Sequence, residues 1–128
     1  MGTVIPITIG PTLTIRPWID PVVDHHGHDA LSYEVETDWL PVLGPTATWL
    51  YRRLGGWAAA YPDGLDVDTA TLAESLGLGV SIGPGCKLDR ALQRLVRFGV
   101  AQWSGGELKV RRSLSAPPKR KVETTSGR

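Results

Sequence analysis

The chain has 128 residues and a mass of 13.9 kDa, about the size of one domain, which argues against two independent cores. A hydrophobic fraction of 41% and a charged fraction of 21% are typical of a packed domain and exclude full disorder. A single cysteine excludes an internal disulfide framework, and no apolar run approaches the ~20 residues of a membrane span. Because no secretory signal pattern opens the chain, we expect a cytoplasmic protein without a membrane partner.

Charge is distributed unevenly along the chain. Residues 1–50 contain 1 basic and 6 acidic residues, a balance of −5, whereas residues 51–128 contain 13 basic and 7 acidic residues, a balance of +6. This asymmetry favours a polyanionic partner for the second half. The alternative is a basic tail that is solvated and has no partner.

The first 43 residues predict an N-terminal β-hairpin arm followed by an acidic loop. Residues 3–9 and 12–16 are rich in β-branched residues, and Gly10-Pro11 between them indicates a turn. Two strands alone are marginally stable in water, so this arm must pack on the rest of the chain or on a second copy. Residues 20–32 predict a polar loop. In residues 33–43 we expect a helical turn or two before Pro41. The side chains expected to be buried there are Tyr33, Val35, Trp39, Leu40 and Leu43.

Residues 44–114 predict three helices and a second hairpin. The first helix begins near Gly44 to Thr46 and ends near Ala60, and the second covers residues 69–76 with an aspartate cap, Asp66 or Asp68. The third covers about residues 86–98 and carries an apolar stripe formed by Leu88, Ala91, Leu92, Leu95 and Val96. The Gly105-Gly106 pair between alternating runs indicates a β-hairpin. Residues 115–128 predict a disordered basic tail.

Three segments of this region resemble the winged helix-turn-helix superfamily. They are LAESLGL at residues 72–78, LDRALQRLVRFGV at residues 88–100 and LKVR at residues 108–111. The chain as a whole, including Arg16-Pro17-Trp18, residues 24–29 and residues 39–50, is similar to a group of short actinobacterial winged-helix proteins. The resemblance implies a mostly α fold with a small β component, in which residues 44–114 are the winged domain. The link at residues 77–85 is longer than that of a compact helix-turn-helix.

The predicted third helix has a basic face. On a helical wheel of about 100° per residue, its four basic side chains fall within about 80°, and this arc is centred roughly 150° from the apolar stripe. One face can therefore enter the core while the other meets phosphates or base edges. The four residues are Lys87, Arg90, Arg94 and Arg97.

These features predict sequence-specific binding of double-stranded DNA by a transcriptional regulator, with the third helix in the major groove. The wing is expected to hold the DNA backbone through Lys109, Arg111 and Arg112. The tail would add affinity without sequence choice through Lys119, Arg120 and Lys121. We also expect a homodimer, because most soluble oligomers are symmetric.

Other functions find less support in the sequence. The alternative to DNA binding is a protein–protein module whose acidic residues, Asp20 to Asp38, dock on transcription or replication machinery. His25, His26 and His28 could bind a divalent metal, but they lack a matching second half of a ligand set. Cys86 is a conceivable redox switch at a helix start. No nucleophile motif is present, so we expect neither an enzyme nor a cofactor.

Overall fold

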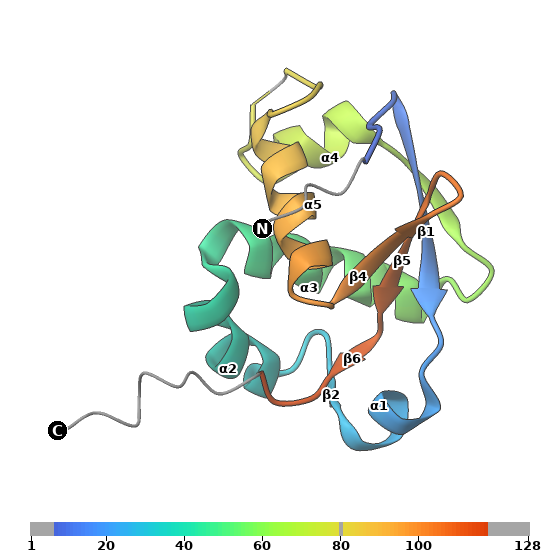
Figure 1. Cartoon of the computed structure of the whole chain (residues 1–128), viewed down its shortest axis with the longest axis vertical. Helices are drawn as coiled ribbons and strands as arrows, with labels where there is room; N and C mark the ends of the chain where they lie inside the picture. Colours follow the sequence, from blue (N-terminus) through green and yellow to red (C-terminus); the bar gives the residue numbers. More distant parts are fainter. Residues whose placement is uncertain (1–6, 80, 118–128) are drawn as a thin grey trace, which may run out of the picture.

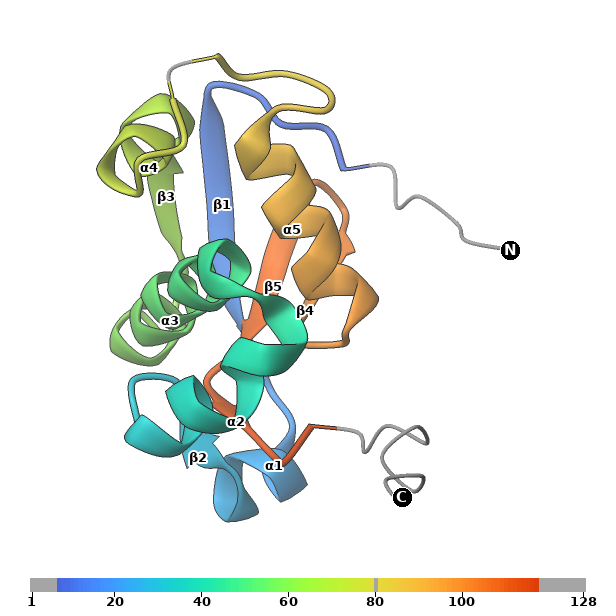
Figure 2. The same cartoon turned by 90° about the vertical axis from the view of Figure 1, so that its left-hand side faces the viewer.

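The computed structural model of the protein describes residues 7–79 and 81–117, and its elements are shown in Figures 1 and 2. The protein has a mixed α/β fold rather than a mostly α one. The helices of the described residues are α1 (Pro21–His26), α2 (Tyr33–Leu43), α3 (Pro45–Ala60), α4 (Thr69–Ser75) and α5 (Lys87–Arg97). The strands are β1 (Thr12–Trp18), β2 (His28–Asp29), β3 (Leu65–Asp68), β4 (Ala101–Ser104), β5 (Glu107–Arg111) and β6 (Ser113–Leu114).

A four-stranded sheet of order β3-β1-β5-β4 forms the centre of the fold. Strand β1 pairs antiparallel with β3 and parallel with β5, and β4 and β5 form an antiparallel hairpin. Positive φ angles at Gly105 and Gly106 close that hairpin, as the Gly-Gly pair predicts. Alternate side chains of the sheet are buried on its helical side: Leu13, Ile15, Leu108 and Val110.

The predicted N-terminal hairpin arm is wrong for the residues that the structure describes. Residues 7–10 form no strand, and residues 1–6 lie outside the described part of the chain. Strand β1 lies between β3 and β5 instead, with Ile15 opposite both Leu65 and Leu108. Its alternating buried side chains fit a central strand, because central placement satisfies both backbone edges while the apolar side chains enter the core.

Helices α3 and α5 pack on each other and on the sheet. Four leucine side chains of these helices lie in the core and have no exposure to solvent: Leu50, Leu54, Leu92 and Leu95. Gly55 allows α3 to approach its neighbours closely, since a Cβ atom there would lie 2.7 Å from the Ala30 Cβ and 3.1 Å from the Arg111 carbonyl oxygen. The core therefore joins the N-terminal third of the chain to the C-terminal hairpin.

The three helices and the hairpin predicted for residues 44–114 are confirmed, with β3 as an unpredicted strand before α4. The polar loop is a partly wrong prediction, because Asp20 caps α1 through the Val23 amide and so lets a short helix form within it. Helix α2 continues through Pro41. Val35, Trp39 and Leu43 are buried as expected, whereas Tyr33 is 75% exposed and Leu40 is 37% exposed.

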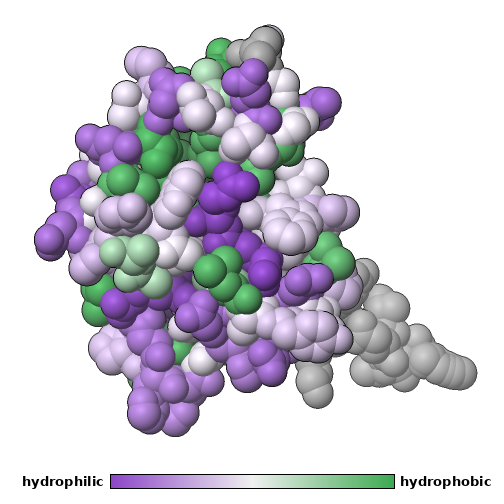
Figure 3. Space-filling model, turned by 180° about the vertical axis from the view of Figure 1, so that it is seen from behind, coloured by the Kyte–Doolittle hydropathy of each residue, from purple (hydrophilic) through white to green (hydrophobic). Residues whose placement is uncertain are grey.

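Residue 115, the first residue of the predicted disordered tail, contacts α2. The Trp39 indole nitrogen donates a hydrogen bond to the Ser115 carbonyl oxygen at 2.9 Å, so residue 115 is held against α2. Residues 118–128 lie outside the described part of the chain. Seen from behind, hydrophilic and hydrophobic residues alternate in small groups over the surface (Figure 3). No helix among the described residues is long and apolar enough to cross a membrane.

Candidate nucleic-acid interface

Helix α5 is held in place by one apolar side and a capped first turn. Leu88, Ala91, Leu92 and Leu95 are buried, as the predicted stripe requires. The Cys86 Sγ accepts a hydrogen bond from the Asp89 amide at 3.4 Å, and the Asp89 carboxylate accepts one from the Gly85 amide at 2.7 Å. These bonds satisfy amides at the start of the helix and place an acidic group there, which favours the helix.

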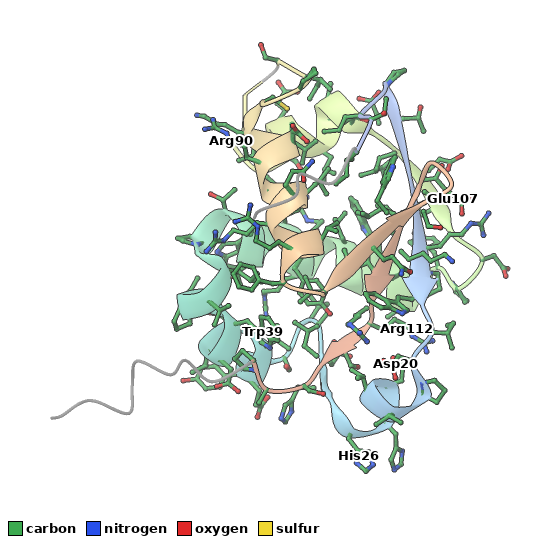
Figure 4. All side chains as sticks on the ribbon, in the orientation of Figure 1. Asp20, His26, Trp39, Arg90, Glu107 and Arg112 are labelled. Carbon is green, nitrogen blue, oxygen red and sulfur yellow. The ribbon has the colours of Figure 1, made fainter. Side chains whose placement is uncertain are left out.

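The opposite side of α5 carries exposed basic residues. Lys87, Arg90 and Arg97 are exposed, and none of them makes a side-chain hydrogen bond or ion pair with a residue in the described ranges. Figure 4 shows Arg90 pointing away from the body of the protein. We call Lys87, Arg90 and Arg97 the α5 basic face. Because its charges have no partner in the described protein, they remain available to an external anion.

Arg94 belongs to the same helix face but has a different role. Its Nε donates to the Leu43 carbonyl oxygen at 2.6 Å, and its Nη2 donates to the Val42 carbonyl oxygen at 2.8 Å. Its guanidinium also lies 5.1 Å from the centre of the Phe98 ring. A cation at the carbonyl end of α2 is favourable, so Arg94 joins α5 to α2. The sequence gives no sign of this contact, because α2 and α5 are far apart in the chain.

Several other arginines also have partners within the protein. Arg16 donates to Glu107 at 3.0 Å and to the Asp63 carbonyl oxygen at 2.9 Å. Arg52 donates to the Ser32 carbonyl oxygen at 2.8 Å, and Arg53 donates to the Ser75 hydroxyl at 2.9 Å. The α5 basic face thus differs from these arginines in having no such partner among the described residues.

The two arginines expected on the wing contact an acidic segment instead. Arg111 donates to Asp20 at 2.8 Å and lies over the Trp18 ring, 3.8 Å from its centre. Arg112 donates to Asp24, and Figure 4 shows Arg112 beside Asp20. The hydrogen bond from Arg111 holds the pKa of Asp20 below its ordinary value. These charges hold α1 against the end of the sheet.

The charge asymmetry of the sequence therefore has an internal component. The pairs between α1 or its cap and residues 111–112 join the acidic and basic halves of the chain. The pairing of Asp20 and Asp24 with these arginines was not predicted from the sequence. The opposite charges of the two segments were visible, but their proximity depends on β1 lying beside β5.

Lys109 lies on the far side of the sheet from the helices. Its neighbours in β5, Leu108 and Val110, are buried on the helical side, so the alternation of a strand turns Lys109 the other way. It sits opposite Arg16 in the register of β1 and β5. Lys119, Arg120 and Lys121, expected in the basic tail, lie outside the described residues.

A groove of about 330 Å³ separates α5 from the corner between α2 and α3. Arg90 and Lys87 line one side of it, and Pro45 and Thr46 at the start of α3 line the other. The groove therefore adjoins the α5 basic face. Arg97 does not line it.

The other candidate sites do not gather ligands. His25 and His26 end α1 with their ring centres 4.6 Å apart, and Figure 4 shows His26 at the outer end of the molecule. Within residues 7–79 and 81–117, no group of three or more metal-ligating side chains is close enough to hold an ion. Cys86 is half-buried, and its sulfur caps α5.

Comparison of the chain with protein-family models, with curated proteins and with solved structures gives no match. The resemblance to winged-helix regulators therefore stands on the quoted segments alone. The positions that the fold gives to the charged residues are the remaining indication of function.

Proposed function

We propose that this protein is a winged helix-turn-helix transcriptional regulator that binds double-stranded DNA in a sequence-specific manner. The order α3-β3-α4-α5-β4-β5 supports this proposal, because three helices followed by a hairpin are the plan of a winged helix. In this arrangement α5 enters the major groove. Strand β1 is an addition to the plan, and it widens the sheet between β3 and β5.

The observation that carries the proposal is the α5 basic face. An α-helix fits the major groove of B-form DNA, where an arginine can bond to both acceptors of a guanine edge. Arg90 and Arg97 are exposed on one helix and have no partner among the described residues. Lys87, at the start of the helix, suits a phosphate contact.

The proposed interface is smaller than the one expected from sequence. Arg94 joins α5 to α2, and Arg111 and Arg112 are paired with aspartates, so we leave these three out. We leave out Lys109 as well, because it faces away from the helices. The turn Gly105-Gly106 carries no side chain, so contact of the wing with DNA would use its backbone amides.

Selection of bound duplexes from random DNA at two salt concentrations tests the proposal. We expect enrichment of one motif, which persists at the higher salt because base contacts depend on salt less than phosphate contacts do. Two copies of the motif in opposite orientation would support the expected homodimer. Bound DNA with the same sequence distribution as the starting pool would contradict sequence-specific binding.

A protein-docking function is favoured by a different surface. The outer side of α2 exposes Tyr33 and Leu40 beside the acidic residues Glu34 and Asp38. Exposed aromatic residues are common at interfaces, and the acidic neighbours suit a basic partner. If this were the function, a protein partner would stay bound after nuclease treatment. The Tyr33→Ser variant would lose that partner, whereas the Arg90→Gln variant would keep it.

A further inference from the structure

The groove beside α5 combines an apolar wall with cations at its mouth. Leu43, Ala47, Leu78 and Ala91 line it, each at most 9% exposed, and the exposed Pro45 closes one side. Lys87 and Arg90 stand at its edge and are exposed. Arg94 also lines the groove, but its guanidinium is bonded to the Val42 and Leu43 carbonyl oxygens.

The charge of the groove selects the sign of a ligand. No acidic side chain is among the described residues that line it. Lys87 and Arg90 have no partner in the described chain, so an anion can pair with them without displacing an existing contact. Hydrogen bonds from charged donors to an anion are among the stronger polar contacts.

The apolar wall selects the body of that ligand. A strongly hydrated ion such as phosphate gains nothing from aliphatic surface and must lose water to reach it. A ring or short hydrocarbon chain gains from leaving water for the same surface. A volume of about 330 Å³ is at the lower end of small-molecule sites, which suits one fused ring system better than an extended ligand.

From these observations we propose that the groove between α5 and the α2–α3 corner binds a small organic anion with an apolar body, such as an aromatic carboxylate. The carboxylate pairs with Arg90 and Lys87. The ring lies against Leu43, Ala47 and Ala91.

Occupancy of the groove would also regulate the α5 basic face. The ligand would pair with two of the residues that we assign to DNA, and leave only Arg97 without a partner. DNA and ligand should then compete. This regulatory consequence rests on the proposed DNA-binding function, whereas binding of the ligand does not.

Titration of the full chain with naphthoate, followed by amide chemical shifts, tests the site. We expect saturable shifts at the amides of Gly44, Thr46, Ala47 and Ala91. Naphthalenemethanol has the ring without the charge, and inorganic phosphate has the charge without the ring. Each should bind at least about tenfold more weakly than naphthoate, because each lacks one half of the interaction.

Two variants on the same helix provide the matched comparison. Arg90→Gln should weaken naphthoate binding about tenfold, whereas Arg97→Gln, which removes the same charge outside the groove, should leave it unchanged. Equal effects of the two variants would overturn the proposed site. Equal binding of naphthalenemethanol, or shifts scattered beyond the groove, would overturn it as well.

A DNA arm of the experiment separates the two proposals. Naphthoate should displace a duplex from the unmodified chain. Groove shifts in a protein that binds no duplex would contradict the DNA-binding function and support the ligand site. A duplex that binds while naphthoate gives no groove shifts would support the DNA-binding function and overturn the ligand site.

Discussion

Single residues decide how closely the elements of this fold approach one another. Gly55 lies where α3 meets both Ala30 and the end of β5. The Tyr51 hydroxyl, one turn earlier, donates to the Arg111 carbonyl oxygen at 2.7 Å, and burial raises the pKa of Tyr51 well above its ordinary value. This part of α3 thus fixes the end of the sheet to which α1 is also attached.

Adjacent glycines in α3 give a matched test of that close approach. Gly55→Ala should lower the Tm by about 3–10 °C, because the new Cβ would meet the Ala30 Cβ at 2.7 Å. Gly56→Ala should leave the Tm unchanged or raise it, because alanine favours the helix and its Cβ would meet only the exposed Leu31 side chain, at 3.3 Å. Thermal unfolding followed by circular dichroism measures both. Equal Tm values for the two variants would show that Gly55 is not required by packing.

The sequence predicts which side chains are buried only where the apolar residues of an element all face a single partner surface. The stripe of α5 is such a pattern: Leu88, Ala91, Leu92 and Leu95 are buried as predicted, whereas Val96 is half-buried. Trp49 and Trp57 are eight residues apart in the chain, a spacing that places them near one helix face and predicts a core position, yet Trp49 is 55% exposed. Helix α3 is covered on its inner side only, and which of its apolar residues face outward depends on the position of the sheet.

Among the elements, α5 is the one whose two sides have separate functions in our proposal. Its polar side divides into the α5 basic face and Arg94, which is bonded to α2. Helical periodicity predicted that these four residues lie together, but not that one of them is used within the protein. That distinction comes from packing between distant segments.

Substitution of Arg94 and of Arg97 should separate stability from binding. Arg94→Gln should lower the free energy of unfolding by about 1–2 kcal/mol, because two carbonyl oxygens at the end of α2 lose a charged donor. Arg97→Gln should change it by less than about 0.5 kcal/mol. Urea denaturation measures both values. A loss of stability in Arg97→Gln as large as in Arg94→Gln would mean that Arg97 also has a structural partner.

At the scale of the whole molecule, β1 and the charge pairs join the two ends of the chain. The sequence predicted β1 as a strand but assigned it a partner within residues 3–9, since a local hairpin is the simplest pairing that a sequence suggests. The observed partners are β3 and β5, which lie far along the chain. No local pattern specifies such pairing, and the same limitation hid the contacts of Asp20 and Asp24 with residues 111–112.

Removal of β1 tests whether residues 1–43 form a separate arm. A chain that begins at residue 19 should lose cooperative thermal unfolding, because β3 and β5 lose their common neighbour and Leu108 loses its cover. A chain that begins at residue 7 keeps β1 and should unfold as the full chain does. A cooperative transition in the chain that begins at residue 19 would support a separate arm.

The salt dependence of duplex affinity tests the central claim that unpaired cations of α5 bind DNA. The triple variant Lys87→Gln, Arg90→Gln, Arg97→Gln is compared with a control of equal net charge, Arg16→Gln, Arg53→Gln, Lys109→Gln, whose residues lie outside the α5 basic face. Each lost phosphate contact reduces the slope of log affinity against log salt by about 0.9. We predict a slope lower by at least about 1 in the α5 variant, because Lys87 is assigned to a phosphate, and a slope close to the unmodified value in the control. Equal slopes for the two triple variants would contradict the assignment of DNA binding to α5.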